Sequence, residues 1–193
     1  LEARIRVAEG DLDGALSVAQ AGFETGPSAE TALLICDLLV HLGRTDETAP
    51  YDEFLRVNLA DERAAGADVD LEAALIEIDR GNLTAGLQLA RQAYETRPDN
   101  VFTASGLAWA LHSTGDSHRA LPYVEQSLRL GSRDALFRYR AAVIFDEVGQ
   151  DQRAAAELRT AFEINPRFSL RYLDDALARA AALGVVVPED AVS

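Results

Sequence analysis

Several absences narrow what this sequence can do. It has no lysine and no methionine, and Cys36 is its only cysteine, so no disulfide can form within the chain. Its 18 cationic residues, all arginine, stand against 32 acidic residues and leave a net charge of -14. A charge of that sign repels phosphate backbones and anionic lipid surfaces. We therefore expect no nucleic-acid partner.

Long apolar runs are also missing. No stretch approaches the roughly 18 consecutive apolar residues that span a bilayer, so we expect no membrane insertion. Because even an initiator methionine is absent, Leu1 is not expected to be the natural start of the protein. What precedes Leu1, and whether the protein is cytoplasmic or exported, stay open.

Catalytic and metal-binding patterns are scarce as well. His41, His112 and His118 lack the i, i+4 spacing of a helical metal site, and no cysteine lies near any of them. The sequence contains no glycine-rich phosphate loop and no nucleophile elbow. The adjacent carboxylates Asp146 and Glu147 would point about 100° apart on a helix. We expect no enzyme activity, no metal ion and no cofactor.

What the sequence does contain is a period. Gly81, Gly115 and Gly149 stand 34 residues apart, and Pro98 and Pro166 stand 68 apart. Seven positions before each glycine lies a small residue, namely Ala74, Ala108 or Ala142. A fixed period of this length predicts an array of repeats, each packed on its neighbours.

The repeated segment resembles a known family. Residues 149–168 resemble the second helix of a tetratricopeptide repeat (TPR), with small Ala154 and Ala161, bulky Phe162 and a closing Asn165 and Pro166. The resemblance implies an all-α, right-handed solenoid of antiparallel helix pairs. We expect one domain over residues 1–193, with a partial unit 1–28, repeats 29–66, 67–100, 101–134 and 135–168, a capping helix 169–184 and a tail 185–193.

Two features break the regular period. The step from Gly43 to Gly81 is 38 residues long, so an extra helical turn or a longer loop is expected within residues 60–68. Pro50 and Pro122 share one repeat position, about one turn inside the second helix. A proline there is expected to bend the helix or to delay its start.

The resemblance also implies a binding groove, because the first helices of such repeats line a concave surface. The groove-facing slots fall on Leu33, Asp37, His41, Leu71, Leu75, Asp79, Phe102, Trp109, His112, Tyr139, Val143 and Asp146. Sites that hold the C-terminal carboxylate of a chaperone carry Lys, Arg and Asn in these slots, so that mode of recognition is not expected here.

The aromatic slots predict the kind of partner. Phe102, Trp109 and Tyr139, edged by acidic residues, suit an extended or helical peptide with apolar anchors and some positive charge. Trp109→Ala is then expected to weaken binding and to leave the fold intact. The alternative is that Trp109 and Tyr139 pack on each other between neighbouring repeats and serve stability alone.

These patterns together predict a non-catalytic scaffold that binds a peptide or helix of a partner protein. A second hypothesis is self-assembly into a homo-oligomer, through the stripe formed by Leu170, Leu173 and Leu177 or through the N-terminal face. An enzyme subunit is a distant third.

Overall fold

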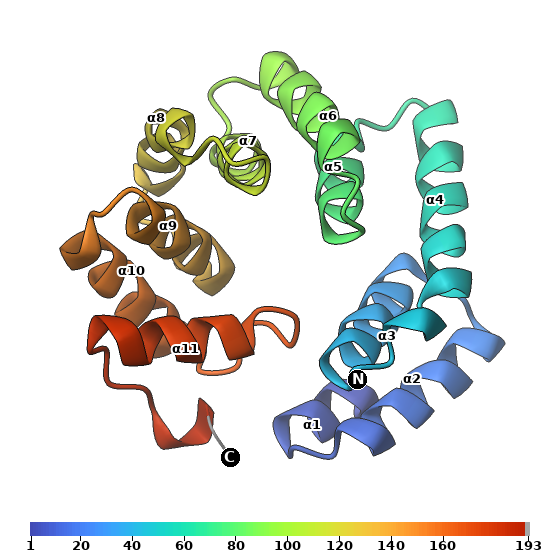
Figure 1. Cartoon of the computed structure of the whole chain (residues 1–193). Helices are drawn as coiled ribbons and strands as arrows, with labels where there is room; N and C mark the ends of the chain where they lie inside the picture. The colour runs from blue at the N-terminus through green and yellow to red at the C-terminus, as the bar shows by residue number, and fades with distance from the viewer. Residues whose placement is uncertain (192–193) are drawn as a thin grey trace. The chain divides into compact units, whose positions relative to one another are not determined.

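The computed structural model describes residues 1–191, which form eleven α-helices and two short 3-10 helices with no strand among them (Figure 1). The helices up to residue 66 are α1 (Glu2–Ala8), α2 (Leu12–Thr25), α3 (Ala29–His41), η1 (Thr45–Glu47) and α4 (Ala49–Ala64). The others are α5 (Asp70–Asp79), α6 (Leu83–Thr96), α7 (Val101–Ser113), α8 (Ser117–Leu128), α9 (Ala135–Glu147), α10 (Asp151–Ile164), α11 (Leu173–Leu183) and η2 (Glu189–Ala191). The all-helical class predicted from the period is confirmed.

The chain forms two compact units. Unit 1 comprises Leu1–Gly66 and Ser169–Asp174, whereas unit 2 comprises Ala67–Phe168 and, among the described residues, 175–191. The core of unit 1 is a cluster of seven buried residues from α1, α2 and α3, namely Ala3, Ala15, Leu16, Ala19, Ile35, Leu38 and Leu39. Tyr51 of α4 and Leu170 pack against this cluster.

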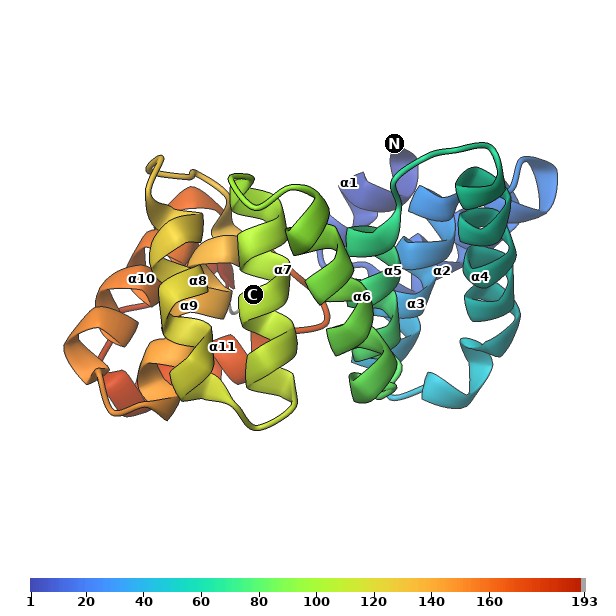
Figure 2. The same ribbon diagram turned by 90° about the horizontal axis from the view of Figure 1, so that it is seen from above.

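Unit 2 contains three helix pairs, α5 with α6, α7 with α8 and α9 with α10. The first helix of the middle pair, α7, contacts both α5 and α9, and it lies between them in both perpendicular views (Figure 1, Figure 2). The repeated small residues Ala74, Ala108 and Ala142 lie on these first helices and are almost fully buried. Small side chains at these crossings let the helices approach closely, so the period of the sequence is also the period of the packing.

The ends of the helices follow from local chemistry. Gly81 and Gly115 reverse the chain between paired helices with φ angles of 81° and 85°, a region that a residue with a Cβ atom rarely adopts. At the start of α7, the side chain of Asn100 accepts a hydrogen bond from the backbone N–H of Phe102. At the start of α9, Asp134 does the same for Phe137. These caps fix where α7 and α9 begin, and therefore where Phe102 and Phe137 lie in the first turns of the two helices.

The irregular features of the sequence also have a structural form. Helix α4 continues to Ala64 and is 16 residues long, so the extra residues after Gly43 lengthen a helix. Pro50 lies in the first turn of α4 behind η1, which delays the start of that helix, and Pro122 lies inside α8. The helix predicted from residue 169 begins only at Leu173, and residues 170–172 before it form turns.

Candidate functional site

The predicted groove residues of unit 1 lie on α3, and the chain itself contacts two of them. Leu33 is 40% exposed. The Asp37 carboxylate accepts a hydrogen bond of 2.9 Å from Nε of Arg171. The His41 Nδ1 atom lies 3.1 Å from the carbonyl oxygen of Leu170, which can only accept. Segment 169–174 therefore engages the polar groove residues of unit 1.

The groove residues on α5 differ in exposure. Leu71 is buried and packs over Gly106 of α7, because a Cβ atom on that glycine would lie 2.3 Å from Leu71 Cδ1. Leu75 is half-buried and Asp79 is exposed. Leu71 is thus part of the contact between α5 and α7, whereas Leu75 and Asp79 keep access to solvent.

The three predicted aromatic anchors also separate by exposure. Trp109 and Tyr139 keep only 6% and 2% of their surface accessible, and their ring centroids lie 6.2 Å apart between α7 and α9. Phe102 is 54% exposed and meets the ring of Phe137 edge-on at 5.2 Å. Trp109 and Tyr139 belong to the packing between repeats, which leaves Phe102 as the aromatic side chain that a partner can reach.

The Trp109 indole is the centre of a mixed cluster. The His112 ring stacks on it at 5.1 Å with an angle of 29° between the planes. The guanidinium carbon of Arg140, on α9, lies 5.5 Å from the centroid of the indole. Sequence reasoning did not include Arg140, which lies one position beyond the assigned slot of Tyr139. The available signal was a lone cation within the apolar run 139–145.

Helix α11 contacts predicted groove residues of α9 in unit 2. Tyr139 donates a hydrogen bond of 2.7 Å through its hydroxyl to Asp175 of α11. Arg179 of α11 pairs with Asp175 at 2.7 Å and also with Asp146 of α9. Val143 is buried. Tyr139 and Asp146, both predicted to bind a partner, are thus engaged within the chain.

His112 has a neutral imidazole at ordinary pH. Burial is the main cause and lowers its pKa below the usual value, while Glu147 and Asp175 act in the opposite direction and Arg179 adds to the lowering. The Nδ1 atom of His112 lies 2.9 Å from the Ser117 hydroxyl oxygen. The indole cluster therefore carries one positive charge, that of Arg140.

The lowered pKa of His112 predicts how stability depends on pH. Below about pH 6.5 the unfolded chain takes up a proton that the folded chain does not, so the contribution of His112 to stability falls as the pH drops through that value. His112→Gln should lose less stability than the wild type between pH 7 and pH 5 (roughly the titration range of histidine), as measured by urea unfolding. His118→Gln, at an exposed position, is the matched control and should behave as the wild type; equal pH profiles for all three proteins would contradict the prediction.

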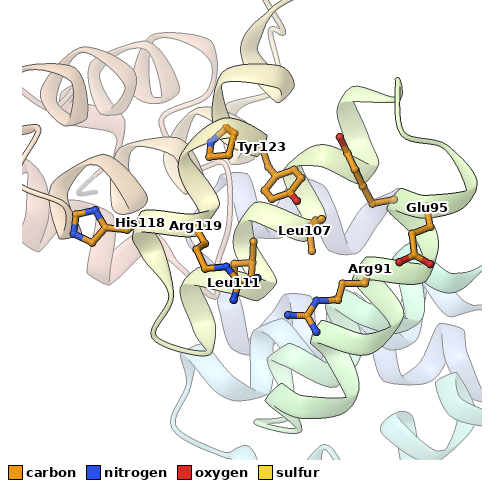
Figure 3. A pocket seen from close by; sticks show the side chains of 9 residues that line it. Arg91, Glu95, Leu107, Leu111, His118, Arg119 and Tyr123 are labelled. Carbon is orange, nitrogen blue, oxygen red and sulfur yellow. The ribbon is translucent and has the colours of Figure 1, made fainter.

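A pocket that was not predicted lies between α6, α7 and α8. It measures about 570 Å³. Figure 3 shows Arg91 and Glu95 of α6, Leu107 and Leu111 of α7, and Arg119 and Tyr123 of α8 around it. Tyr94 and Tyr123 meet edge-on at 5.0 Å across the pocket, and Arg119 pairs with Asp116 at 2.9 Å. No period in the sequence indicates this pocket, because its lining combines three helices from two repeats.

Two searches of the described residues bear on other kinds of site. Within residues 1–191, no group of three or more His, Cys, Asp or Glu side chains is placed to hold a metal ion. None of the helices in that range has the length and apolarity needed to cross a membrane.

The succession of antiparallel helix pairs defines a helical-repeat protein with the TPR-like fold. Among solved structures, the chain is similar to TTC0263, a thermophilic TPR protein of Thermus thermophilus, with a TM-score of 0.61 and 18% identity over 95% of this chain and 96% of that one. It is also similar to MamA of Desulfovibrio magneticus, with a TM-score of 0.50 and 14% identity over 81% and 86% of the two chains. No protein-family model and no curated protein sequence matches it. At these identities the likeness establishes the fold.

Proposed function

We propose that this chain is a non-catalytic scaffold that binds a segment of a partner protein across the first helices of unit 2. The observation that carries the proposal is Phe102, an aromatic side chain that is 54% exposed on the face where the sequence predicts binding. It is the only aromatic residue among the large apolar residues exposed in the described part of the chain.

The geometry around Phe102 suits an anchor for a partner. Phe137 supports its ring from the next repeat, and the side-chain caps at Asn100 and Asp134 fix the first turns that carry the two rings. A surface that is already ordered lowers the entropy cost of binding. An apolar side chain of the partner that covers Phe102 removes apolar surface from water on both sides.

The ion pairs of the acidic groove residues bear on the charge of the partner that the sequence predicts. In unit 2 the acidic slot Asp146 is paired with the chain's own Arg179, and in unit 1 the acidic slot Asp37 is paired with Arg171. These pairs support the expectation that acidic positions on the first helices attract arginine. In unit 2, Phe102 is the exposed aromatic side chain of the face, and Leu75 and Asp79 of α5 also keep access to solvent, so an apolar anchor is the main requirement for a partner.

The proposal predicts that Phe102→Ala loses binding without losing the fold. The immobilised protein should retain a set of proteins from its native source, and Phe102→Ala should reduce their capture about tenfold or more, as for an interface hot spot. Leu130→Ala is the matched control, because Leu130 is 71% exposed but lies in the loop between α8 and α9. Identical capture by the wild type and both variants, quantified by mass spectrometry, would refute the proposal.

Self-assembly is the second candidate. Leu173 is buried and Leu170 packs against the core cluster of unit 1, so the predicted leucine stripe is used largely within the chain. The observation that favours self-assembly is the N-terminal helix α1, where Ile5 is 49% exposed. Light scattering at several concentrations separates the two candidates, since only self-assembly predicts a mass that rises with concentration and falls in Ile5→Ser.

A further inference from the structure

Arg140 is a buried cation on α9 at the centre of unit 2. Only 6% of its surface is accessible, and its Nε atom is sealed from solvent without a hydrogen bond. Its guanidinium lies against the indole of Trp109. Within the described part of the chain, no carboxylate lies within ion-pair distance of it.

Two other arginines, Arg6 and Arg97, also have buried nitrogen atoms without a hydrogen bond, but both of them pair with a carboxylate. Arg6 pairs with Asp11 at 2.7 Å, and Arg97 pairs with Asp68 at 3.0 Å. Arg138, two residues before Arg140 on the same helix, pairs with Glu157 at 2.7 Å. Each of these three arginines is matched by a carboxylate, whereas Arg140, the buried arginine of the described residues, is not.

A buried guanidinium without a counter-charge costs folding free energy. Buried charges are normally paired, because removal from water penalises the charged form. The indole face offsets only part of that penalty, since a cation–π contact is weaker than a desolvated ion pair. A site that costs stability while empty is expected where a ligand supplies the missing charge.

We propose that Arg140 is the receptor for one carboxylate of the partner, the side chain of an Asp or Glu next to the apolar group that covers Phe102. This inference rests on the proposed function and specifies its ligand. Phe137, three residues before Arg140 on α9, contacts Phe102, so the apolar anchor and the cation lie on neighbouring turns. A planar guanidinium can bind both oxygens of a carboxylate.

The charge of the cluster favours a single carboxylate over a phosphate group. His112 beside the indole is neutral, and Arg179 nearby is paired with Asp175 and Asp146, so Arg140 is the cation in contact with the indole that has no carboxylate partner in the described chain. A phosphate carries more negative charge and three acceptor oxygens, and proteins usually meet it with several donors. The net charge of -14 also disfavours a doubly charged ligand.

Trp109 reports on this site directly, because it is the only tryptophan in the chain. The probe is N-acetylglutamate α-amide, which carries one carboxylate, that of the side chain; it is added to the protein while the single indole N–H signal is followed by NMR. N-acetylglutamine α-amide is the neutral control, and sodium chloride and inorganic phosphate are compared at equal ionic strength. We expect a saturable shift with N-acetylglutamate α-amide alone; equal shifts with the neutral control or the salt, or a stronger response to phosphate, would overturn the inference.

Two arginine variants test whether Arg140 is the residue that binds the carboxylate. Arg140→Met should abolish the response to N-acetylglutamate α-amide, whereas Arg138→Met, which breaks an ion pair on the same helix, should keep it. Arg140→Met should also melt at or above the wild-type temperature, because it removes an unpaired buried charge. A persistent shift in Arg140→Met, or a melting temperature several degrees below the wild type, would show that Arg140 serves the fold instead.

The two proposals fail in different ways. If Phe102→Ala loses the captured partners while Arg140→Met captures them fully and the wild type shows no carboxylate response, the scaffold stands and the carboxylate receptor does not. If N-acetylglutamate α-amide binds at Arg140 but Phe102→Ala captures as the wild type does, the anion site stands and the proposed face does not.

Discussion

Trp109→Ala should lower the free energy of unfolding by about 3–5 kcal/mol, the usual cost of truncating a buried aromatic side chain. The indole is 6% exposed and contacts Tyr139, His112 and Arg140. Its removal would leave a cavity between α7 and α9 that the rigid helix pairs cannot fill. Urea unfolding followed by circular dichroism measures the loss.

The matched control for Trp109→Ala is Phe102→Ala on the same helix. Phe102 is 54% exposed, so its truncation should change stability by only about 1 kcal/mol or less. If Trp109→Ala unfolded at the wild-type urea concentration, the indole would not belong to the packed layer. The hypothesis that Trp109 is a binding anchor predicts that outcome, whereas the alternative that it packs against Tyr139 between repeats, like the burial of the ring, predicts the opposite.

The contrast between Trp109 and Phe102 shows where sequence reasoning about the site stops. The repeat position of a residue indicates which side of the helix it occupies, and both residues were assigned to the groove on that basis. Exposure depends also on how closely the next repeat approaches. Tyr139 and Arg140 of α9 cover Trp109. Only side-chain packing between repeats reveals that cover.

The helix pairs of unit 2 could be predicted because their signal is repeated. Gly81 and Gly115 mark the turns within pairs, and both adopt positive φ angles there. The buried alanines recur with the same period, since every repeat meets its neighbours through the same contacts. The spacing after Gly43 breaks this period, and the division between the two units falls in the same region, at Gly66.

Residues 169–172 show why the start of α11 could not be predicted. Their apolar pattern continues that of the helix, but the structure uses their polar groups for contacts distant in sequence. The Leu170 carbonyl lies against His41, and the Arg171 guanidinium binds Asp37. A local pattern carries no information on partners more than 120 residues away, as the separations of 129 and 134 residues show.

Gly86 provides the second large prediction, because the repeat pattern and the packing disagree on it. The same repeat slot holds Ala120 and Ala154 in the next two repeats, so the pattern suggests that alanine would stabilise α6. The structure indicates the reverse. A Cβ atom on Gly86 would lie 2.6 Å from Cγ1 of Ile78 and 3.0 Å from the backbone oxygen of Ala74.

Gly86→Ala should therefore destabilise the protein. Overpacking of a tight core costs about 1–3 kcal/mol. That cost equals or exceeds the roughly 1 kcal/mol by which alanine stabilises a helix relative to glycine. Gly22→Ala in α2 is the control, since a Cβ atom there meets nothing within 4 Å and only the helix propensity changes. Urea unfolding should show opposite signs for the two variants. Equal stabilisation by both would mean that α5 and α6 separate easily enough to admit a methyl group, and that the repeat pattern predicts this slot better than the packing does.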